Sequence, residues 1–381
     1  MPTDLRVLVD ATAVPADRGG VGRYADNLIA ALDSAGANLA VVCQQADAAL
    51  YGRLAPRSIV IAAPAATARR PVRLLWEQTG LPLVADLVGA HVVHCPHYTM
   101  PLWRAGPPVV VTLHDATFFT DPELHTPVKG RFFRLATRHA VRRAARCIVP
   151  SVATRNQISR LLPARADRLD VAYHGVDLTA FTPAAAADIE RVRASLGLGR
   201  QPYVGFLGTL EPRKNVPALI RGWVAAVRDR SEPPVLVLAG SRGWDAEVDR
   251  AAAEVPAGLR LLRPGYLPLD DLPAFLSGAT VLAYPSLGEG FGLPVLEAMA
   301  CGAAVLTTDR LSLPEVGGDA VGYTGTSAAE IGVALAQLLD DAPRRAALAG
   351  RARARAERFS WDRSAQQHLR SYAAAAGREP A

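Results

Sequence analysis

The sequence predicts an α/β protein with two doubly wound domains, each built around a parallel sheet. Short apolar runs alternate with segments of helical period along most of the chain, and strands separated by helices are typical of βαβ units. The alternation pauses after residue 171 and restarts near residue 201. A length of 381 residues also fits two domains better than one.

In the first half, each expected strand is a short apolar run with turn residues close by. The runs are LRVLVDA (5–11), LAVVCQ (39–44), SIVIAAP (58–64), HVVHCP (91–96), PVVVTLHD (108–115) and RCIVPS (146–151). We expect a glycine-rich loop after the first strand, then a helix over about 21–34, and a later helix over 130–146.

The second half repeats this pattern after an Ala/Pro-rich and then helical stretch, 178–200, which we expect to carry the crossover. The expected strands are YVGFLGT (203–209), PVLVLAG (234–240), LRLLRPGY (259–266), ATVLAYPS (279–286) and AAVLTTD (303–309). Ligands of such sheets bind at the carboxyl ends of the strands, so two sheets of this kind predict a ligand site there.

Composition narrows the class of protein and of partner. A net charge of +6 indicates an anionic partner: nucleic acid, phosphorylated substrate or lipid surface. Of the 42 basic residues only two, Lys129 and Lys214, are lysines. The chain has four scattered cysteines and an N-terminus unlike a secretory signal, which together predict a cytoplasmic protein. It has no apolar run of 18 residues, so we expect no membrane-spanning helix.

The strongest motif is SLGEGFGLPVLEAMACGAAVLTTD, residues 286–309. Pro294 suits the first turn of a helix and Gly302 suits its end. The free amides of the glycine loop and helix start predict an anion site. Glu289 and Glu297 flank it and can accept hydrogen bonds from hydroxyls. A nucleotide sugar carries both a diphosphate and hydroxyls, whereas a plain turn with a solvated glutamate is the alternative.

This motif resembles the E-x7-E region of the retaining family 4 glycosyltransferases, whose GT-B fold has two Rossmann-like domains facing across a cleft. Further similar segments are GGVGRYADNL (19–28), TLHD (112–115), VPS (149–151), GTLEPRKN (208–215) and FSWDRSA (359–365). The resemblance implies an acceptor-side domain over 1–172, onto which a C-terminal helix over 360–381 packs back. It implies a nucleotide-sugar-binding domain over 173–359.

The resemblance also implies a reaction and its residues. A hexose, with mannose from GDP-mannose as first choice and a UDP-sugar as second, passes with retention to a glycan, lipid-linked or small-molecule acceptor. In the family's front-face displacement the leaving diphosphate takes the acceptor proton, with no metal, no cofactor and no nucleic acid. The catalytic residues are His114 and Glu289. The donor-binding residues are Gly20, Val21, Gly22, Gly208, Arg213, Lys214, Tyr266, Gly290, Phe291, Gly292, Leu293 and Glu297.

Several of these residues have a second interpretation. Adjacent Arg213 and Lys214 at a strand end can neutralise a diphosphate, or they form a solvated basic turn. His114 either lies near the donor sugar or is a buried histidine bonded to Asp115. Gly20-x-Gly22-x-x-Ala25 fits a dinucleotide fingerprint, although it lies too far from its strand, and it keeps an NAD-dependent oxidoreductase as an alternative. A catalytically inactive sugar-binding or membrane-surface module is the non-enzymatic alternative.

Two segments bear on the acceptor and the membrane. The histidines of HVVHCPHYTMPL (91–102) suggest a metal site, but neighbouring strand residues point to opposite faces and no other Cys/His cluster completes a shell. We therefore expect no metal, and we expect His97, Tyr98 and Ser151 on the acceptor side. The arginine-rich helix 130–146 is either a solvated face or a peripheral contact with the inner face of the membrane.

Overall fold

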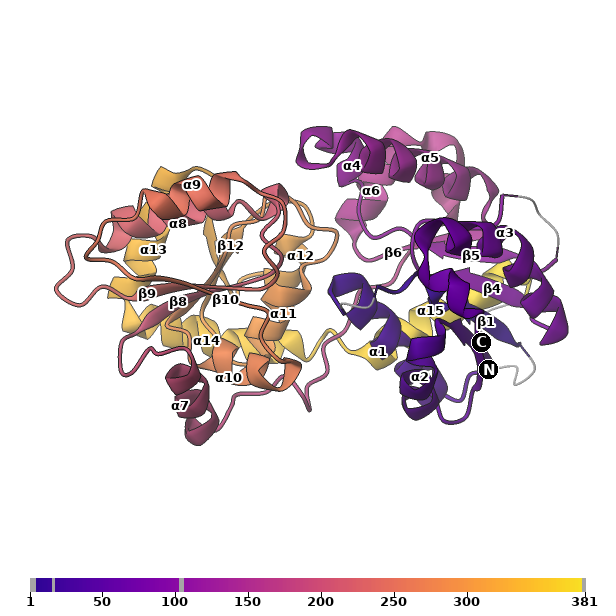
Figure 1. Ribbon diagram of the computed structural model, residues 1–381, viewed down its shortest axis with the longest axis horizontal. Helices are drawn as coiled ribbons and strands as arrows, with labels where there is room; N and C mark the ends of the chain where they lie inside the picture. The colour runs from indigo at the N-terminus through magenta and orange to yellow at the C-terminus, as the bar shows by residue number, and fades with distance from the viewer. Residues whose placement is uncertain (1–4, 16–17, 103–105, 379–381) are drawn as a thin grey trace. The chain divides into compact units, whose positions relative to one another are not determined.

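The computed structural model describes residues 5–15, 18–102 and 106–378, with the backbone alone for 164–166, and the chain forms two compact units. One unit comprises Met1–Gly175 and Ser360–Ala381, and the other Val176–Phe359. The division therefore falls after residue 175 rather than after 172, and the C-terminal segment belongs to the first unit (Figure 1).

The first unit contains a seven-stranded parallel sheet in the order β3-β2-β1-β4-β5-β6-β7. Its strands are β1 (Val7–Asp10), β2 (Leu39–Cys43), β3 (Ile59–Ala62), β4 (Val92–Cys95), β5 (Val109–Thr112), β6 (Arg146–Val149) and β7 (Leu169–Val171). Its helices are α1 (Gly20–Ser34), α2 (Ala48–Leu54), α3 (Arg70–Leu87), α4 (Thr117–Thr120), α5 (Pro127–Arg143), α6 (Val152–Leu161) and α15 (Trp361–Ala375), and its short 3-10 turns include η1 (Ala11–Ala13) and η3 (Ala65–Ala68).

The second unit repeats the design with a six-stranded sheet in the order β10-β9-β8-β11-β12-β13. Its strands are β8 (Tyr203–Leu207), β9 (Val235–Ala239), β10 (Leu261–Gly265), β11 (Val281–Tyr284), β12 (Val305–Thr308) and β13 (Gly322–Thr324). Its helices are α7 (Ala186–Ser195), α8 (Val216–Val227), α9 (Glu247–Ala253), α10 (Leu272–Ser277), α11 (Leu293–Ala300), α12 (Leu313–Gly317), α13 (Ala328–Asp340) and α14 (Ala342–Ala356), and η6 (Pro212–Lys214) is a 3-10 turn.

The central strands form because their apolar residues are buried on both faces, as parallel sheets covered by helices require. Every residue of β1, β2, β8, β9 and β11 is buried. Edge strand β10 is more exposed and its register with β9 shifts between Leu262 and Gly265. In each sheet the strand order reverses once, between β1 and β4 and between β8 and β11. Such reversals are where open parallel sheets bind ligands.

A chain of buried hydrogen bonds fixes α15 to the first sheet. Figure 1 shows α15, in yellow, beside the strands of that unit, and it packs on α1, β5 and β6. The His368 Nδ1 donates to the Ser364 carbonyl (2.7 Å), so its Nε2 must accept from the Tyr24 hydroxyl (2.8 Å). The Tyr24 oxygen then accepts from Thr112 (2.7 Å).

The same chain returns from Thr112 to α15 through His94. Because the Thr112 proton goes to Tyr24, the Thr112 oxygen accepts from His94 Nε2 (2.8 Å). His94 Nδ1 in turn accepts from the Tyr372 hydroxyl of α15 (2.9 Å). All of these side chains are fully buried, and burial lowers the pKa of both histidines, so both rings are neutral.

The helix predicted over about 21–34 is confirmed by α1, whereas the helix predicted over 130–146 has different limits. Helix α1 begins at Gly20, so Gly20, Val21 and Gly22 form its first turn rather than a loop. Helix α5 covers Pro127–Arg143 instead of 130–146, and Arg146 begins β6 and pairs with Asp170.

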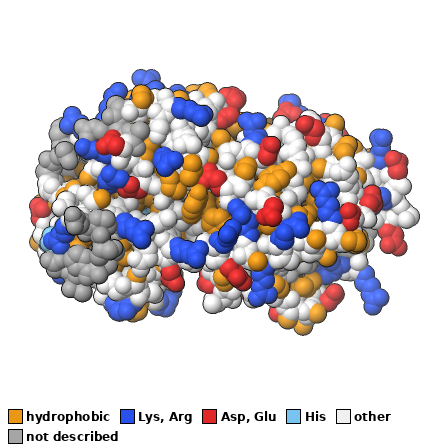
Figure 2. Space-filling model, turned by 180° about the vertical axis from the view of Figure 1, so that it is seen from behind, with side chains coloured by type: hydrophobic (Ala, Val, Ile, Leu, Met, Phe, Trp, Pro, Cys, Tyr) orange, Lys and Arg blue, Asp and Glu red, His pale blue; other side chains and the backbone are white. Residues whose placement is uncertain are grey.

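The positive charge is dispersed over the face of the molecule seen in Figure 2. Figure 2 shows Lys and Arg side chains spread over the visible face with acidic side chains among them. None of the helices in the described ranges is long and apolar enough to cross a membrane.

Candidate active site

The reversal of the second sheet brings the predicted cations and a predicted glutamate together. Arg213 and Lys214 lie in η6, which follows β8, and Glu289 lies in the loop that follows β11. Strands β8 and β11 are paired neighbours, so their carboxyl ends lie at the same edge of the sheet. Residues about 75 positions apart in the chain are thereby in direct contact.

The Glu289 carboxylate is the centre of this cluster. One oxygen accepts from Lys214 Nζ (2.7 Å), Ser286 Oγ (2.6 Å) and the Tyr284 hydroxyl (3.0 Å). The other accepts from Arg213 (2.5 Å), which also bonds the Gly288 carbonyl (2.8 Å) and Glu211 (2.6 Å). Glu289 and Lys214 are each 7% exposed.

This arrangement fixes the charge state of the carboxylate. Burial acts to raise the pKa of Glu289, but the positive charges of Arg213 and Lys214 and the donated hydrogen bonds lower that pKa to about 2. Burial and the charge of Arg213 lower the pKa of Lys214 from its usual value, while Glu289 opposes that shift. The cluster therefore holds an ionised carboxylate between two cations, a pairing that the sequence did not reveal.

Backbone bonds hold the loop from β11 to α11 in place. The Leu287 amide donates to the Arg213 carbonyl (2.8 Å), and Ser312 Oγ donates to the carbonyls of Glu289 (2.8 Å) and Phe291 (2.9 Å). Gly292 precedes α11 at φ 103°, a left-handed conformation that favours glycine. Pro294 lies in the first turn of α11 and Gly302 follows its end at φ 72°, as predicted.

The other donor residues predicted in the second unit lie at the same end of its sheet or on its edge, whereas Gly20, Val21 and Gly22 lie in the first unit. Gly290, Phe291, Gly292 and Leu293 lead into α11, and Glu297 lies within it, 4% exposed. Gly208 directly follows β8. Gly240 packs against its carbonyl, and a Cβ on Gly240 would lie 2.2 Å from the Gly208 oxygen. Tyr266 follows edge strand β10 and is 62% exposed.

In the first unit, His114 lies just beyond β5. Its Nε2 donates to the Pro96 carbonyl (2.8 Å) and not to Asp115, whose carboxylate instead accepts from Thr117. Burial lowers the pKa of His114, so the ring is neutral and its Nδ1 is an acceptor. The ring packs edge-on against Tyr24, with centroids 5.2 Å apart.

The residues predicted on the acceptor side have different environments. His97 lines a pocket of the first unit. Tyr98 is 2% exposed and its hydroxyl accepts from the Asp115 amide (2.9 Å). Ser151 is fully buried and caps α6 by accepting from the Thr154 amide (3.0 Å). Burial and these bonds give Tyr98 and Ser151 a structural role, and their placement on the acceptor side remains a prediction.

Gly22 of α1 and His94 of β4 have close contacts within the first unit. Gly22 is buried, and a Cβ there would lie 3.0 Å from Arg18, while Val21 lines the pocket that contains His97. Both ring nitrogens of His94 are hydrogen-bonded within the fold. Within the described ranges, the His, Cys, Asp and Glu side chains form no group of three that could hold a metal ion.

Comparison with known proteins identifies the family. A family model described as Glycosyltransferase Family 4 matches residues 18–180, and one described as Glycosyl transferases group 1 matches residues 188–355. The O-antigen chain mannosyltransferase B of Escherichia coli is 33% identical over 290 residues, a match that covers 74% of each chain. The chain belongs to glycosyltransferase family 4.

A second relative and a solved structure are also similar to this chain. The D-inositol 3-phosphate glycosyltransferase of Salinispora arenicola is 37% identical over 222 residues, which cover 54% of this chain and 49% of that protein. A crystal structure of HepE from Anabaena in complex with UDP-glucose superposes with a TM-score of 0.75 at 21% identity, over 95% of this chain and 97% of that one. The fold is therefore GT-B, and membership of the family excludes the oxidoreductase alternative.

Proposed function

We propose that this family 4 glycosyltransferase transfers a hexose with retention from a nucleoside-diphosphate sugar, with mannose from GDP-mannose as the first candidate. Arg213, Lys214 and the amides from Gly290 to Leu293 bind the diphosphate. Glu289 accepts a hydrogen bond from the transferred sugar, and Glu297 accepts from the ribose hydroxyls. The acceptor is a glycan, a lipid-linked saccharide or a small molecule.

The observation that carries this proposal is the cluster of Arg213, Lys214 and Glu289 at the reversal of the second sheet. Lys214 uses two of its three N–H donors on Glu289 and Tyr284, which leaves one for a phosphate oxygen. The start of α11 adds amides that favour an anion. Because the cations are fixed before the ligand binds, they stabilise negative charge on the leaving diphosphate without reorganising.

The same cluster supports transfer without a metal ion or other cofactor. Two protein cations supply the charge neutralisation that a divalent metal supplies in other enzymes. In a front-face displacement, the leaving phosphate oxygen takes the proton of the acceptor hydroxyl as the new glycosidic bond forms. For His114 of the first unit we propose a hydrogen bond with a hydroxyl of the substrate, because the Nδ1 of its neutral ring is an acceptor. We expect transfer to be unaffected by EDTA.

The choice of mannose follows the name of the E. coli relative, and the alternative UDP-sugar follows the complex of HepE with UDP-glucose. A thermal-shift screen of GDP-mannose, UDP-glucose and NAD separates these donors, because a ligand that binds the folded state raises the unfolding temperature. We expect the largest shift with GDP-mannose. A shift with NAD alone would contradict the proposal.

Two substitutions divide the proposed roles. Lys214→Met removes a charge-assisted hydrogen bond worth roughly 1.5–3 kcal/mol, so GDP affinity measured by calorimetry should fall about 10- to 100-fold. Glu289→Gln should leave GDP affinity within about threefold but reduce transfer at least about a hundredfold, because the interaction lost is one to the sugar.

The matched control for charge is Arg228→Met. Arg228 ends α8 in the same unit, with its side chain 64% exposed, and should bind GDP as the unmodified protein does. The unfolding midpoint of each unliganded variant shows whether it is folded. Transfer that survives both Lys214→Met and Glu289→Gln in folded protein would refute the site.

We also propose that the enzyme works in the cytoplasm. We propose in addition that α5 contacts the membrane surface peripherally. On α5, Val128 and Leu135 are 83% and 55% exposed beside Arg131. Two other arginines of this helix serve the fold: Arg134 donates to the Phe118 carbonyl (2.9 Å) and Arg138 lies over the Phe119 ring. Sedimentation with vesicles containing anionic lipid, with and without Leu135→Ser, tests this contact.

A further inference from the structure

Helix α3 of the first unit buries charged side chains and exposes large apolar ones. Its buried residues recur every four positions, and they are Arg73, Glu77, Leu81 and Ala85. The first two form an ion pair (2.9 Å). A helix at the surface of a globular protein ordinarily buries its apolar stripe and exposes its charges. The first half of α3 does the opposite, so its outer side needs an explanation of its own.

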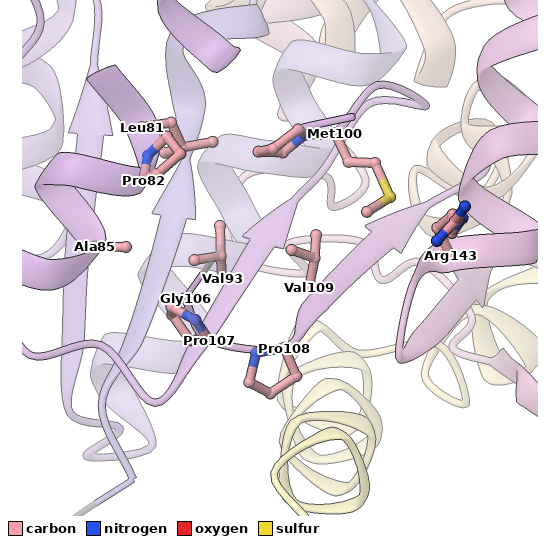
Figure 3. Close-up of a pocket in the computed structure, with 11 residues that line it drawn as sticks. Leu81, Pro82, Ala85, Val93, Met100, Gly106, Pro107, Pro108, Val109 and Arg143 are labelled. Atoms are coloured by element: carbon pink, nitrogen blue, oxygen red, sulfur yellow. The ribbon is translucent and has the colours of Figure 1, made fainter. Parts of the chain in front are cut away.

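The inner side of α3 is occupied by the fold of the first unit. In its first turns, Arg70 and Arg73 line a pocket together with Lys129. Farther along, Leu81 and Ala85 line a second pocket of about 190 Å³, which Figure 3 shows beside strands β4 and β5. None of the exposed leucines of α3 lines either pocket, so these contacts account for the inner side alone.

The outer side of α3 carries a stripe of exposed side chains without charge. Steps of three, four, four and four residues separate its members, so they share one side of the helix. They are Val72 (37% exposed), Leu75 (65%), exposed Thr79, Leu83 (63%) and Leu87 (85%). Single exposed apolar residues are ordinary, but a continuous apolar patch marks an interaction surface.

The two ends of this outer stripe carry opposite charges. Arg69 directly precedes α3 and Asp86 lies in its last turn, and both are exposed. Neither forms an ion pair with another residue of the described ranges. Arg70, the other exposed cation at the first end, lies over the Phe132 ring at 5.3 Å. The outer stripe is therefore bounded by one unpaired cation and one unpaired anion.

The outer stripe has two matching halves about Thr79. Leu75 and Leu83 lie four residues before and after it, while Val72 and Leu87 lie seven before and eight after. A two-fold axis at Thr79 would place α3 against α3 of a second copy in the antiparallel direction. Leu75 then meets Leu83 of the second copy, and Val72 meets Leu87 of the second copy. A two-fold interface makes every such contact twice.

The charges fit the same antiparallel arrangement. Arg69 lies ten residues before Thr79 and Asp86 seven after it. The three-residue difference is about 4.5 Å along the helix, a distance that an arginine side chain spans. Each end of the contact therefore brings Arg69 to Asp86 of the second copy. A parallel arrangement would instead set like charges against each other at both ends, which disfavours it.

We infer that the outer stripe of α3 is the contact surface of a two-fold symmetric homodimer. The dimer is independent of the donor and acceptor proposed above. An 18-residue helix is about 27 Å long, so two such helices bury less than about 1,200 Å² between them. Interfaces of this size are typical of weak, transient complexes. We therefore expect a reversible dimer with a Kd of about 1–100 µM.

A membrane surface is the other kind of partner that takes an apolar helix face. Helices that lie on membranes carry lysines and arginines on the polar face beside the apolar one. The opposite face of α3 is instead buried within the first unit, and one end of the outer stripe carries Asp86. A second copy, which offers both the matching leucines and the matching charges, fits better.

The first test is sedimentation velocity of the full chain from about 1 to about 200 µM, across the expected Kd. The sedimentation coefficient should rise from that of a monomer to that of a dimer. Leu83→Ser should raise the Kd at least about tenfold, because both copies lose a buried leucine. The matched control is Leu161→Ser on α6, a leucine that is 40% exposed and lies outside α3, and it should leave the Kd unchanged.

The second test reverses the charges at the two ends. Arg69→Glu and Asp86→Arg should each raise the Kd about tenfold, because like charges then meet at both ends. Each change suits the charge of its helix end, so the fold should be kept, which the urea unfolding midpoint checks. An equal mixture of the two single variants should form a heterodimer with about the Kd of the unmodified protein, because opposite charges face each other again.

Three results would overturn the dimer. The first is a protein that stays monomeric up to about 200 µM. The second is a dimer that Leu83→Ser leaves as tight as before, or a mixture of the charge variants that associates no better than either alone. The third is a monomer that sediments with anionic vesicles and loses that binding in Leu83→Ser, which would assign the outer stripe to a membrane. GDP affinity should be the same in all of these variants, so failure of the donor site is measured separately.

Discussion

Lowering the pH from 7 to 5 should destabilise the first unit, because its buried histidines stay neutral while those of the unfolded chain take up protons. In the chain of hydrogen bonds that ties α15 to the sheet, His368 donates through Nδ1 and accepts through Nε2. Protonation would place a second donor against the Tyr24 hydroxyl and a charge in a site without exposure. Burial lowers the pKa of His368 from its usual 6.5 to about 4.

The sign and size of the effect follow from proton linkage. Between pH 6.5 and 4 the unfolded state binds more protons than the folded state, so stability increases with pH and is lost as the pH falls. From pH 6.5 to 5, a difference of about one proton over 1.5 pH units corresponds to about 2 kcal/mol for His368 alone. Burial lowers the pKa values of His94, His97, His114 and His174 as well, so they act in the same direction.

Urea unfolding followed by tryptophan fluorescence at pH 7, 6 and 5 measures this slope, since Trp361 is buried at the start of α15. The His368→Gln variant should be less stable at pH 7 by roughly 1–3 kcal/mol, because a buried bond is lost. Its stability should nevertheless depend less steeply on pH, by about 1.4 kcal/mol per pH unit below 6.5. The other histidines are common to both proteins, so parallel pH profiles would refute the reasoning.

Two further predictions concern backbone conformation and a buried ion pair. Gly292→Ala should cost about 1–3 kcal/mol in urea unfolding, because φ is 103° and the new Cβ would lie 2.8 Å from Leu313. Gly20→Ala should change stability by less than about 1 kcal/mol, because no atom lies within 4 Å of the new Cβ. Equal losses of stability in the two variants would contradict backbone strain at Gly292. Arg73→Leu should cost about 3–5 kcal/mol at pH 7, since Glu77 would remain buried without its cation. Adding Glu77→Leu should restore much of that loss, and no recovery in the double variant would contradict this account.

The parts of the fold that the sequence predicts well are those set by local chemistry. The β-branched run at 109–112 is a strand, Pro294 lies in the first turn of a helix, and a left-handed glycine follows the end of that helix. Where a prediction failed, a local pattern had two solutions. The glycines at 20 and 22 permit a loop, yet they lie in the first turn of α1, where Gly22 packs against Arg18.

The candidate site shows the same division. Sequence spacing alone identifies Glu289 as a polar residue in a glycine loop and Arg213 with Lys214 as a basic turn, and the family resemblance gives them roles. The spacing does not show that all three side chains form one ion-paired cluster, because that depends on β8 and β11 being neighbours in the sheet. The burial of Ser151 and Tyr98 could not be predicted either, since burial is a property of packing.

By itself, then, the sequence determines two parallel α/β units, the family, and the residue types from which an anion site can be built, because propensity, periodicity and turn chemistry act over a few residues. Tertiary structure alone decides which of those residues meet. The reversal of strand order in each sheet places the ends of distant strands side by side, and there the two lysines of the chain have their separate settings: Lys214 against Glu289, and Lys129 in a pocket lined by cations.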